Sequence, residues 1–365
     1  NNTACNYNSS ATQDDGTCYS VGDACDDANA NTSDDVYNDS FICEGQWIVP
    51  GCTNNTACNY NSSATQDDGT CYYIGSPCND GNSNTFNDAY STSCICEGTT
   101  SGTGPLNITT ALIPAGTFTM GSSTTEPDRD TNEEQHTVTL SAFRMSVYEI
   151  TNAQYATFLN ANGIGANGQY AAGAYPDQTL IYDCGTYNGL SYNGAQWQPE
   201  AGKENFPVVC VSWYGAAEFA TYAGGRLPTE AEWEYACRGG TTTPFNTGNC
   251  LDYTQASYVW DYPYSGCSNA NTNNPGQTQA VDTYASNAYG LYNMHGNIWE
   301  WCSDWYGAYG TAAQTNPTGP SSGVNRVLRG GSWISNSRYC RSAVRSGNFP
   351  GGNYGNSGFR LAFLP

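Results

Sequence analysis

The residues of this chain that could bind a metal ion lie in one short stretch, GLYNMHGNIWEW at 290–301. Asn293 supplies an amide oxygen and Glu300 a carboxylate, and the turn at Gly296-Asn297 can direct backbone carbonyls inward. Oxygen ligands of this kind suit a hard cation such as calcium. The alternative, from the residues alone, is that Asn293 and Glu300 only stabilise a tight turn.

Other arrangements of catalytic residues are poorly represented. The chain has two histidines, His136 and His295, and its sequence holds no HExxH, GxSxG or phosphate-loop motif. We expect His295, inside the 290–301 stretch, to be structural rather than a general base. Carboxylates are plentiful, but no spacing singles out a hydrolytic pair.

Several elements must position the 290–301 stretch. Alternating apolar and polar residues predict strands around Thr117, Thr119 and 136–143. Three helices are predicted from their capping residues, which are Thr151 with Gln154, Ser212 before a helix that stops at Gly224-Gly225, and Thr229 with Glu232. Long loops rich in glycine, asparagine and tyrosine fill 160–205 and 241–286. We therefore expect two or three helices, many short strands and long loops.

Further motifs accompany these elements in a fixed order. They are IPAGTFTMGS (113–122), YEITNAQYATFL (148–159), FPVVCVSWYGAAEFATYAGGRLPTEAEWEYACRGG (206–240), NAYGLYNMHGNIWEWCSDW (287–305), RVLRGGSW (326–333), CRSAVR (340–345) and GFRLAF (358–363). With them, the segment 112–363 resembles the formylglycine-generating-enzyme (sulfatase-modifying factor) domain, a variant of the C-type-lectin fold. The resemblance implies an irregular α+β domain. It also implies calcium ligands at Asn293, Gly296, Ile298 and Glu300, with Gly296 and Ile298 binding through backbone carbonyls.

Enzymes of this family use a pair of cysteines near the C-terminus, which binds copper and oxidises a substrate cysteine to formylglycine. The corresponding segment here holds only Cys340, and Ser335 and Ser342 stand where thiols are expected. A hydroxyl cannot replace a soft thiolate as a ligand of cuprous copper. We therefore expect no copper and no enzymatic activity, and we expect Cys340 to form a disulfide, with Cys302 as the candidate partner.

The segment 333–354 has the composition of a contact surface, because rigid aromatics alternate with small polar residues. It also resembles the variable region of retroelement-diversified C-type-lectin-like proteins, whose residues between fixed points form the ligand face. The predicted ligand-binding residues are Trp333, Ile334, Asn336, Ser337, Tyr339, Val344, Ser346, Asn348, Phe349 and Tyr354. The alternative is a buried loop that packs on the fold. Arg329, Arg345 and Arg360 lie in the fixed part of the pattern, where we expect structural ion pairs.

An internal repeat fills the first hundred residues. The sequence NNTACNYNSSATQDDGTC at 1–18 recurs unchanged at 54–71, which is a period of 53 residues. We predict a first cysteine-rich acidic repeat at 1–50, a second at 51–98, a linker at 99–106 and the large domain at 107–365. The repeats resemble cysteine modules of large secreted proteins from Bacteroidetes-like bacteria.

The repeats are too poor in aliphatic residues to fold around a hydrophobic core, so disulfides or metal ions must stabilise them. Ten of their cysteines are predicted to form disulfides: Cys5, Cys18, Cys25, Cys43, Cys52, Cys58, Cys71, Cys78, Cys94 and Cys96. The candidate calcium ligands are Asp14, Asp15, Asp67, Asp68, Asn79, Asp80, Asn82, Asn84 and Asp88. The alternative for these oxygen-rich turns is a set of Asx turns on a solvated acidic surface.

The composition limits the cellular location of the chain and the classes of molecule that it can bind. The net charge is −22, and residues 1–104 contribute 14 acidic and no basic residues, which argues against nucleic acid or anionic lipid as a partner. Seventeen cysteines predict an oxidising, extracellular or cell-surface location. No run of 18 apolar residues occurs, so we expect no membrane insertion. Asn1 already lies inside a repeat, and we expect a processed or truncated chain.

These observations favour a non-enzymatic extracellular protein with a structural or adhesive role. We expect copies of it to self-assemble into a filament or appendage, with a head domain that binds an unknown protein or glycan. Seventeen is an odd number, so at least one cysteine lacks an intrachain partner and could bond to a neighbouring chain. The alternative is a monomeric ligand-binding surface protein, lectin-like or retroelement-diversified, and the least favoured function is a formylglycine-generating oxidase.

Overall fold

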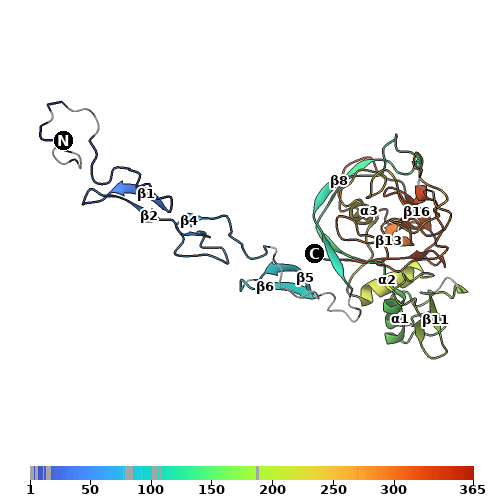
Figure 1. Ribbon diagram of the computed structural model, residues 1–365. Coiled ribbons are helices and arrows are strands. Elements are labelled where there is room, and N and C mark those ends of the chain that lie inside the picture. Colours follow the sequence, from blue (N-terminus) through green and yellow to red (C-terminus); the bar gives the residue numbers. More distant parts are fainter. Residues whose placement is uncertain are drawn as a thin grey trace. The chain divides into compact units, whose positions relative to one another are not determined.

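The computed structural model divides the chain into a small unit, Asn1–Thr100, and a large unit, Ser101–Pro365 (Figure 1). The described residues are 4, 7–10, 12–13, 18–76, 78, 85–91, 93–100, 106, 108–185, 189–268 and 270–365. Within these residues, no helix is both long enough and apolar enough to cross a membrane.

The described part of the small unit consists of two antiparallel hairpins and a short parallel pair of strands. Its strands are β1 (Thr32–Tyr37), β2 (Cys43–Trp47), β3 (Pro50–Gly51), β4 (Gln66–Asp67), β5 (Thr85–Tyr90) and β6 (Cys96–Thr100). The β1–β2 and β5–β6 pairs are antiparallel, and each has a register irregularity at the same place in the repeat. Stacked tyrosines with centroids 4.3 Å and 4.0 Å apart, Tyr19 on Tyr37 and Tyr72 on Tyr90, also occupy equivalent positions. The two described copies therefore share one local structure.

Four disulfides stabilise the small unit in place of a core. They are Cys25–Cys43, Cys52–Cys71, Cys58–Cys94 and Cys78–Cys96, and each lies within one of the two predicted repeats. Disulfide bonding is confirmed for these eight cysteines. Cys5 lies outside the described residues, and the disulfide of Cys18 stays a prediction.

In its described residues, the large unit combines several small sheets with three α-helices. Its strands are β7 (Thr110–Ile113), β8 (Gly116–Met120), β9 (His136–Leu140), β10 (Phe143–Ser146), β11 (Leu190–Tyr192), β12 (Trp197–Pro199), β13 (Trp299–Trp305), β14 (Gln314–Thr315), β15 (Arg326–Arg329), β16 (Arg345–Asn348), β17 (Ser357–Gly358) and β18 (Ala362–Phe363). The described strands form sheets of order β16-β15-β13-β17, β18-β10-β7, β14-β9-β8 and β11-β12. The predicted strands at 117–119 and 136–143 correspond to β8, to β9 and to the start of β10.

The helices begin at the predicted capping residues. They are α1 (Asn152–Ala161), α2 (Trp213–Tyr222) and α3 (Glu230–Arg238). Thr151 and Thr229 form complete capping boxes, and the Ser212 hydroxyl accepts the backbone N–H of Gly215. Helix α1 packs against α2 and β12, whereas α3 packs against β8, β13 and β15 (Figure 1). The α3 helix therefore lies between the early strands and the C-terminal sheet.

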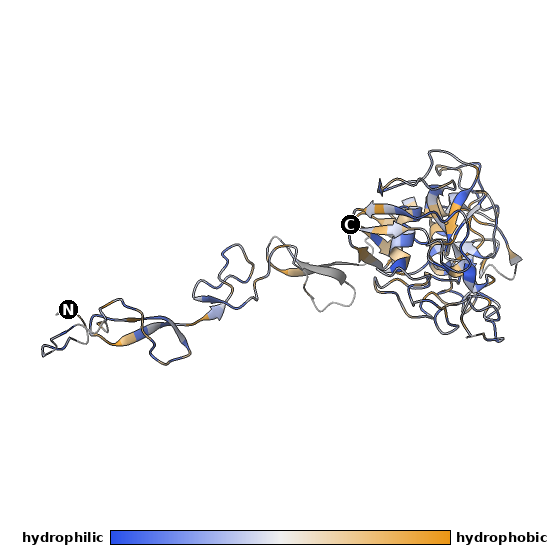
Figure 2. Ribbon diagram, turned by 90° about the horizontal axis from the view of Figure 1, so that it is seen from above, coloured by the Kyte–Doolittle hydropathy of each residue, from blue (hydrophilic) through white to orange (hydrophobic). Residues whose placement is uncertain are grey.

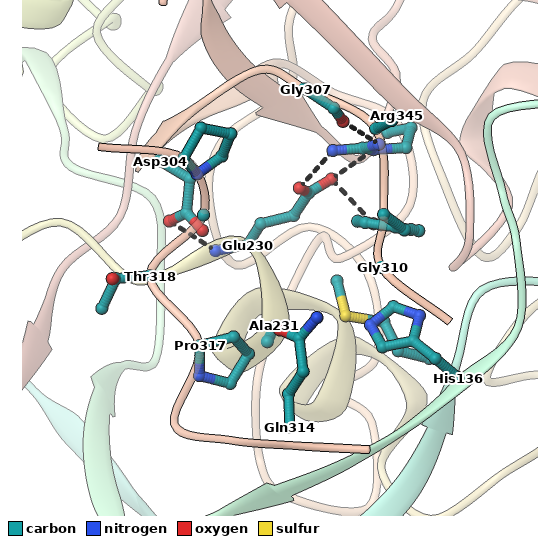
Figure 3. Close-up of a pocket in the computed structure, with 15 residues that line it drawn as sticks. His136, Glu230, Ala231, Asp304, Gly307, Gly310, Gln314, Pro317, Thr318 and Arg345 are labelled. Atoms are coloured by element: carbon teal, nitrogen blue, oxygen red, sulfur yellow. Dashed lines mark hydrogen bonds and ion pairs between the residues drawn. The ribbon is translucent and has the colours of Figure 1, made fainter. Parts of the chain in front are cut away.

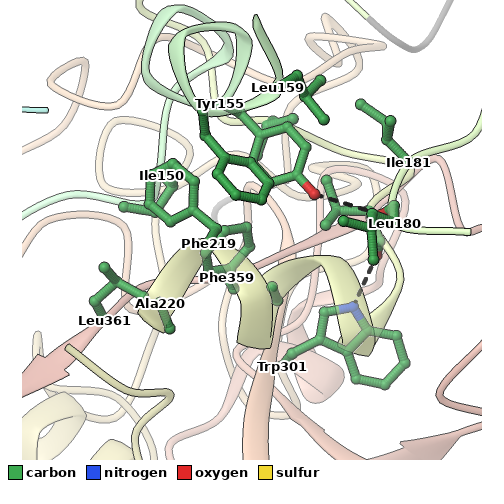
Figure 4. Close-up of a cluster of buried hydrophobic side chains, with 14 of the residues drawn as sticks. Ile150, Tyr155, Leu159, Leu180, Ile181, Phe219, Ala220, Trp301, Phe359 and Leu361 are labelled. Atoms are coloured by element: carbon green, nitrogen blue, oxygen red, sulfur yellow. Dashed lines mark hydrogen bonds between the residues drawn. The ribbon is translucent and has the colours of Figure 1, made fainter. Parts of the chain in front are cut away.

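The core of the large unit contains two main clusters of buried apolar residues, and hydrophobic segments gather on its central strands (Figure 2). In the cluster around α1 and α2, the rings of Tyr155, Phe219 and Phe359 meet with centroids 5.4–6.0 Å apart (Figure 4). The Trp301 indole N–H donates to the Val211 carbonyl at 3.0 Å, so the polar edge of this buried ring is satisfied. Burial of each such side chain contributes about 1.5–3 kcal/mol.

Buried ion pairs connect the last strands to the rest of the large unit. Arg360 donates from Nε and Nη2 to the two carboxylate oxygens of Glu300, at 2.6 Å and 2.7 Å. Arg345 binds Glu230 in the same two-pronged way, and Arg329 pairs with Glu234. The prediction of structural ion pairs for Arg329, Arg345 and Arg360 is thus confirmed.

Arg360→Met is expected to destabilise the large unit by about 3–5 kcal/mol, because it leaves the Glu300 carboxylate buried without its partner. Equilibrium denaturant unfolding of the full chain measures this change. Arg338→Met is the control, since Arg338 faces solvent and lies 4.0 Å from Asp130, a pair whose loss costs about 1 kcal/mol or less. Equal effects of the two substitutions would contradict the assignment.

Candidate functional site

The 290–301 stretch folds around a carboxylate from another part of the chain. Glu149, just before α1, is buried, and its two oxygens accept the side-chain amides of Asn293 and Asn297, each at 2.8 Å. Burial is the main cause that raises the pKa of Glu149 to about 7. Glu149 was not among the predicted ligands, although it lies in the YEITNAQY motif.

Glu300 occupies a different electrostatic environment. Its carboxylate accepts hydrogen bonds from Nε and Nη2 of Arg360. It also accepts the indole N–H of Trp233 at 2.8 Å. The charge of Glu300 is therefore already neutralised by Arg360. Glu149, in contrast, forms no ion pair with any described residue, so the excess negative charge of this region lies on Glu149 rather than on Glu300.

The backbone of the turn requires special conformations. Asn293, Gly296 and Asn297 have positive φ angles of 54°, 78° and 61°. A Cβ on Gly296 would collide with the carbonyl oxygen of Ser257, so only glycine fits there. The Asn297 carbonyl in turn accepts the backbone N–H of Trp333 at 3.0 Å, which fixes the start of the 333–354 segment.

The donors present at this turn suit a hard cation. The Oδ1 atom of Asn293 is buried and has no hydrogen-bond partner, although the same side chain donates to Glu149 and to the Val281 carbonyl. An orphaned amide oxygen beside an unpaired carboxylate is an arrangement that calcium would satisfy. The calcium prediction thus keeps Asn293 as its best-supported ligand, and Gly296, Ile298 and Glu300 stay predictions.

The acidic turns of the repeats show local hydrogen bonds. Asp67 Oδ1 accepts the Gly69 N–H, and Asp68 Oδ1 accepts the backbone and hydroxyl of Thr70. These bonds are Asx turns on exposed residues, as the alternative reading expected. The candidate ligands Asp14, Asp15, Asn79, Asp80, Asn82 and Asn84, together with the side chain of Asp88, lie outside what the structure describes.

The cysteines of the large unit differ from the prediction. Cys302 and Cys340 are free and buried, so the predicted disulfide between them is wrong. Cysteine spacing alone does not give the distance between two Cα atoms, which decides whether a bond can form. The disulfides that do form are Cys184–Cys210 and Cys250–Cys267, which the sequence analysis missed. Because three thiols, Cys237, Cys302 and Cys340, stay buried and free, the odd cysteine count is no argument for an interchain bond.

The free thiols of the large unit are poorly reactive. Burial raises the pKa of Cys237 to about 12, and it also raises the pKa values of Cys302 and Cys340. The Cys340 carbonyl accepts the Nδ1–H of His295 at 2.7 Å, and Nε2 of His295 accepts the N–H of Asn246. Burial lowers the pKa of His295 to about 4, so this histidine is a neutral, hydrogen-bonded structural residue.

The 333–354 segment is only partly a surface. Ile334, Tyr339 and Phe349 are 51%, 37% and 58% exposed. Trp333, Asn336, Ser346, Asn348 and Tyr354 are half-buried. The expectation of exposure is wrong for Ser337 and Val344, which are buried. The hydroxyl of Ser337 donates to the Tyr262 carbonyl. Val344 lies in the sequence between Arg341 and Arg345, which form buried ion pairs. Both side chains therefore pack inside the domain.

A second loop adds aromatic surface beside Ile334 and Tyr339. Val259 forms a parallel bridge with Asn336, and its N–H donates to the Ser335 carbonyl at 2.9 Å. This contact places the exposed Tyr262 next to the 335–339 backbone. The Cys250–Cys267 disulfide closes this loop. The sequence analysis missed it, although the aromatic run YVWDYPY at 258–264 was a visible signal.

The second disulfide supports the other end of the segment. The N–H of Cys210, bonded to Cys184, donates to the Tyr354 carbonyl at 3.1 Å. The hydroxyl of Tyr182 donates to the Gly351 carbonyl at 2.8 Å. Both ends of the 333–354 segment are thus fixed by loops that a disulfide closes. Rigid support of this kind lowers the entropy cost of ligand binding.

Comparison with known proteins identifies relatives of the large unit. Residues 101–364 match the family described as sulfatase-modifying factor enzyme 1-like domain. The chain is 37% identical over 302 residues to the formylglycine-generating enzyme of Mus musculus. The aligned region covers 75% of this chain and 80% of the mouse enzyme. It is 36% identical over 286 residues to the formylglycine-generating enzyme of Streptomyces coelicolor. That aligned region covers 68% of this chain and 87% of the Streptomyces enzyme.

Two solved structures share the fold. Treponema denticola variable protein 1 superposes with a TM-score of 0.53 and 25% identity, over 71% of this chain and 95% of that one. PvdO from Pseudomonas aeruginosa superposes with a TM-score of 0.54 and 27% identity. The match covers 70% of this chain and 94% of PvdO. The predicted C-type-lectin-like α+β fold is confirmed by these neighbours and by the family match.

Native-state alkylation is expected to spare Cys237, Cys302 and Cys340, because buried thiols with raised pKa values hold almost no thiolate. Iodoacetamide labelling followed by peptide mass spectrometry measures this, and labelling in denaturant is the control that shows all three to be unbonded. Rapid native labelling of Cys340 would contradict the assignment.

Proposed function

We propose that this chain, which belongs to the sulfatase-modifying factor enzyme 1-like domain family, is a non-enzymatic extracellular binding protein whose ligand contacts the 333–354 segment. The observation that carries the proposal is the exposure of Ile334, Tyr339 and Phe349 on backbone that is fixed by buried ion pairs and disulfides. Exposed apolar and aromatic side chains on a rigid support are typical of binding surfaces.

The alternative function is that of an oxidase, which is the activity of the family's enzymes. Identities of 36–37% with formylglycine-generating enzymes support it. Against it, the 333–354 segment contains one thiol, Cys340, which is buried and has a raised pKa. A copper-binding pair needs two accessible thiolates. The fold is shared with a solved variable protein at 25% identity, so it is not restricted to chains named as formylglycine-generating enzymes.

The six described disulfides support an extracellular location, because such bonds persist in oxidising compartments. Two of them hold the loops around the proposed contact surface, as described above. In the reducing interior of a cell these loops would lose that support. An extracellular ligand, either protein or glycan, therefore fits the proposal.

A variant with Ile334, Tyr339 and Phe349 changed to Ser is expected to lose at least about tenfold in affinity, because truncating central contact side chains typically costs 2 kcal/mol or more. Binding to glycan arrays and to immobilised extracellular-matrix proteins measures this. The control variant changes Leu112 and Val324 to Ser, which are 44% and 77% exposed but lie outside the segment. Equal binding by both variants would contradict the proposal.

We also propose that calcium binds at the 290–301 turn. Asn293 would supply its orphaned Oδ1, Glu149 would supply the uncompensated charge, and by family resemblance Gly296, Ile298 and Glu300 would complete the site. Calcium bound there would stabilise the turn that holds Trp333, and would thus support the contact surface without taking part in a reaction.

Calcium at about 100 times its Kd is expected to stabilise the large unit by about 2.7 kcal/mol, and chelation is expected to remove this gain. Thermal unfolding with calcium and with EDTA measures it. Glu149→Gln should abolish the calcium response, whereas Glu204→Gln, on an exposed residue outside the turn, should leave it intact. An unchanged melting curve together with no metal by elemental analysis would contradict the proposal.

A third proposal concerns self-association through the small unit. Equivalent positions of the two repeats expose aliphatic side chains, with Val21 and Ile74 at 46% and 58%, and Ile42 and Ile95 at 54% and 56%. Repeated apolar residues on the surface of an acidic module favour contact with another protein surface, and neighbouring copies of the chain supply a matching one. This supports a filament or appendage subunit.

Electron microscopy of the purified chain is expected to show filaments or regular arrays. The variant Ile42→Ser with Ile95→Ser should disperse them, because it removes one apolar residue from each repeat. Leu364→Ser is the control, since Leu364 is 82% exposed on the large unit. Dispersed monomers of the unaltered chain would contradict the self-association proposal and leave the binding proposal standing.

A further inference from the structure

A cavity that contains Arg345 but none of the exposed residues Ile334, Tyr339 and Phe349 opens beside the start of α3. Its volume is about 290 Å³, and its walls come from α3, from β8 and β9, and from the loop that follows β13 (Figure 3). Met120, Ala231 and Pro317 supply apolar wall, whereas Asp304, Glu230 and His136 supply polar groups. A volume of this order suits a ligand near the small end of the range that protein pockets accept.

Asp304 is the unusual wall residue. It is 4% exposed, and its Oδ2 accepts the Glu230 N–H and the Ser303 hydroxyl, both at 3.0 Å. Its Oδ1 receives no hydrogen bond from the described residues, and none of their cations forms an ion pair with it. Burial, followed by the nearby Glu230 charge, raises the pKa of Asp304 to about 7. A buried carboxylate without an ionic partner is costly unless something pairs with it.

The other charges of the cavity are already paired. Arg345 donates from Nε and Nη2 to the Glu230 carboxylate, at 2.8 Å and 2.6 Å, and from Nη1 to the Gly307 carbonyl at 2.7 Å (Figure 3). The Tyr309 hydroxyl also donates to Glu230. A further Nη1 bond to the Asn132 carbonyl brings the occupied N–H donors of Arg345 to four of its five, and the charge of its guanidinium is paired with Glu230. The unpaired charge that faces the cavity is the negative charge of Asp304.

His136 supplies a second acceptor on the opposite side of the cavity (Figure 3). Its Nδ1 lies 3.1 Å from the Glu134 carbonyl, and because a carbonyl can only accept, Nδ1 carries the proton. In the tautomer protonated at Nδ1, Nε2 is the acceptor nitrogen, and no described residue donates to it. Tyr309 holds the ring in place, since its centroid lies 4.8 Å from the imidazole and 3.7 Å from the Arg345 guanidinium.

We propose that this cavity is a binding site for a small organic cation with a primary ammonium group and further hydroxyl donors, of the size of a single amino sugar. The ammonium pairs with Asp304 Oδ1, and a hydroxyl of the ligand donates to Nε2 of His136. Asp304 is more than a cap for α3, because a capping role uses only the oxygen that Glu230 and Ser303 already occupy. The site shares Arg345 with the 333–354 segment but none of the exposed side chains Ile334, Tyr339 and Phe349.

Isothermal titration calorimetry with glucosamine tests the proposal, and N-acetylglucosamine, which lacks the ammonium group, is the matched ligand control. We expect glucosamine to bind and N-acetylglucosamine to bind at least tenfold more weakly. Asp304→Asn should weaken glucosamine at least tenfold, because the amide keeps an acceptor for Glu230 but loses the charge. Glu232→Gln, the same chemical change on a neighbouring α3 residue that pairs with Arg226, should leave binding unchanged.

A blocking variant keeps the test decisive if Asp304→Asn fails to fold. Ala308 is exposed and lines the cavity, so Ala308→Phe should fill it and abolish binding without disturbing the core. No glucosamine binding up to about 10 mM would overturn the proposal. Equal binding of the two sugars, or unchanged binding by folded Asp304→Asn or by Ala308→Phe, would also overturn it.

Discussion

Buried pairs of carboxylate and guanidinium groups connect segments of the large unit that lie far apart in the sequence. Arg341 binds Glu133 through two donors at 2.8 Å, and Arg360 binds Glu300. Helix α3 contributes two more carboxylates, Glu230 and Glu234, and the last strands bring arginines to both. Removing such charges from water costs several kcal/mol for each ion, and the two-pronged hydrogen bonds of Arg341, Arg345 and Arg360 offset part of this cost.

This constraint separates a fixed part of the domain from a variable one. Arg329 ends β15 and Arg345 begins β16, so the two residues flank the 330–344 segment, and both are held by carboxylates of α3. Side chains between them, such as Ile334 and Tyr339, reach solvent and make no ion pair. The fold can therefore change its contact surface without disturbing the charges that stabilise it. A domain of this kind can lose a chemical activity and keep its structure.

Much of the fold could be predicted because the signals were local. The capping boxes at Thr151 and Thr229 each involve residues three positions apart, and their geometry follows from that spacing. The ion pairs of Arg329 and Arg360 were predictable because the surrounding motifs resemble a known family. The repeat disulfides followed from small, core-poor modules that need covalent support.

The remaining features depend on contacts that sequence spacing does not show. Glu149 lies 144 residues from Asn293, and nothing in either motif reveals their hydrogen bond. The predicted bond between Cys302 and Cys340 was wrong because each thiol is buried in its own apolar surroundings. Val344 was expected at the surface by resemblance to the variable region of diversified proteins, but it lies between the buried Arg341 and Arg345 and is itself buried.

The central claim is that this chain keeps the family fold without the family chemistry. The most direct test incubates the copper-treated chain with a sulfatase-derived cysteine peptide, next to a formylglycine-generating enzyme as the positive control, and measures aldehyde formation by mass spectrometry. The account predicts aldehyde with the control enzyme and none with this chain, because Cys340 is buried and has no second thiol in its segment. Aldehyde formed by this chain, and lost in Cys340→Ser, would contradict the account.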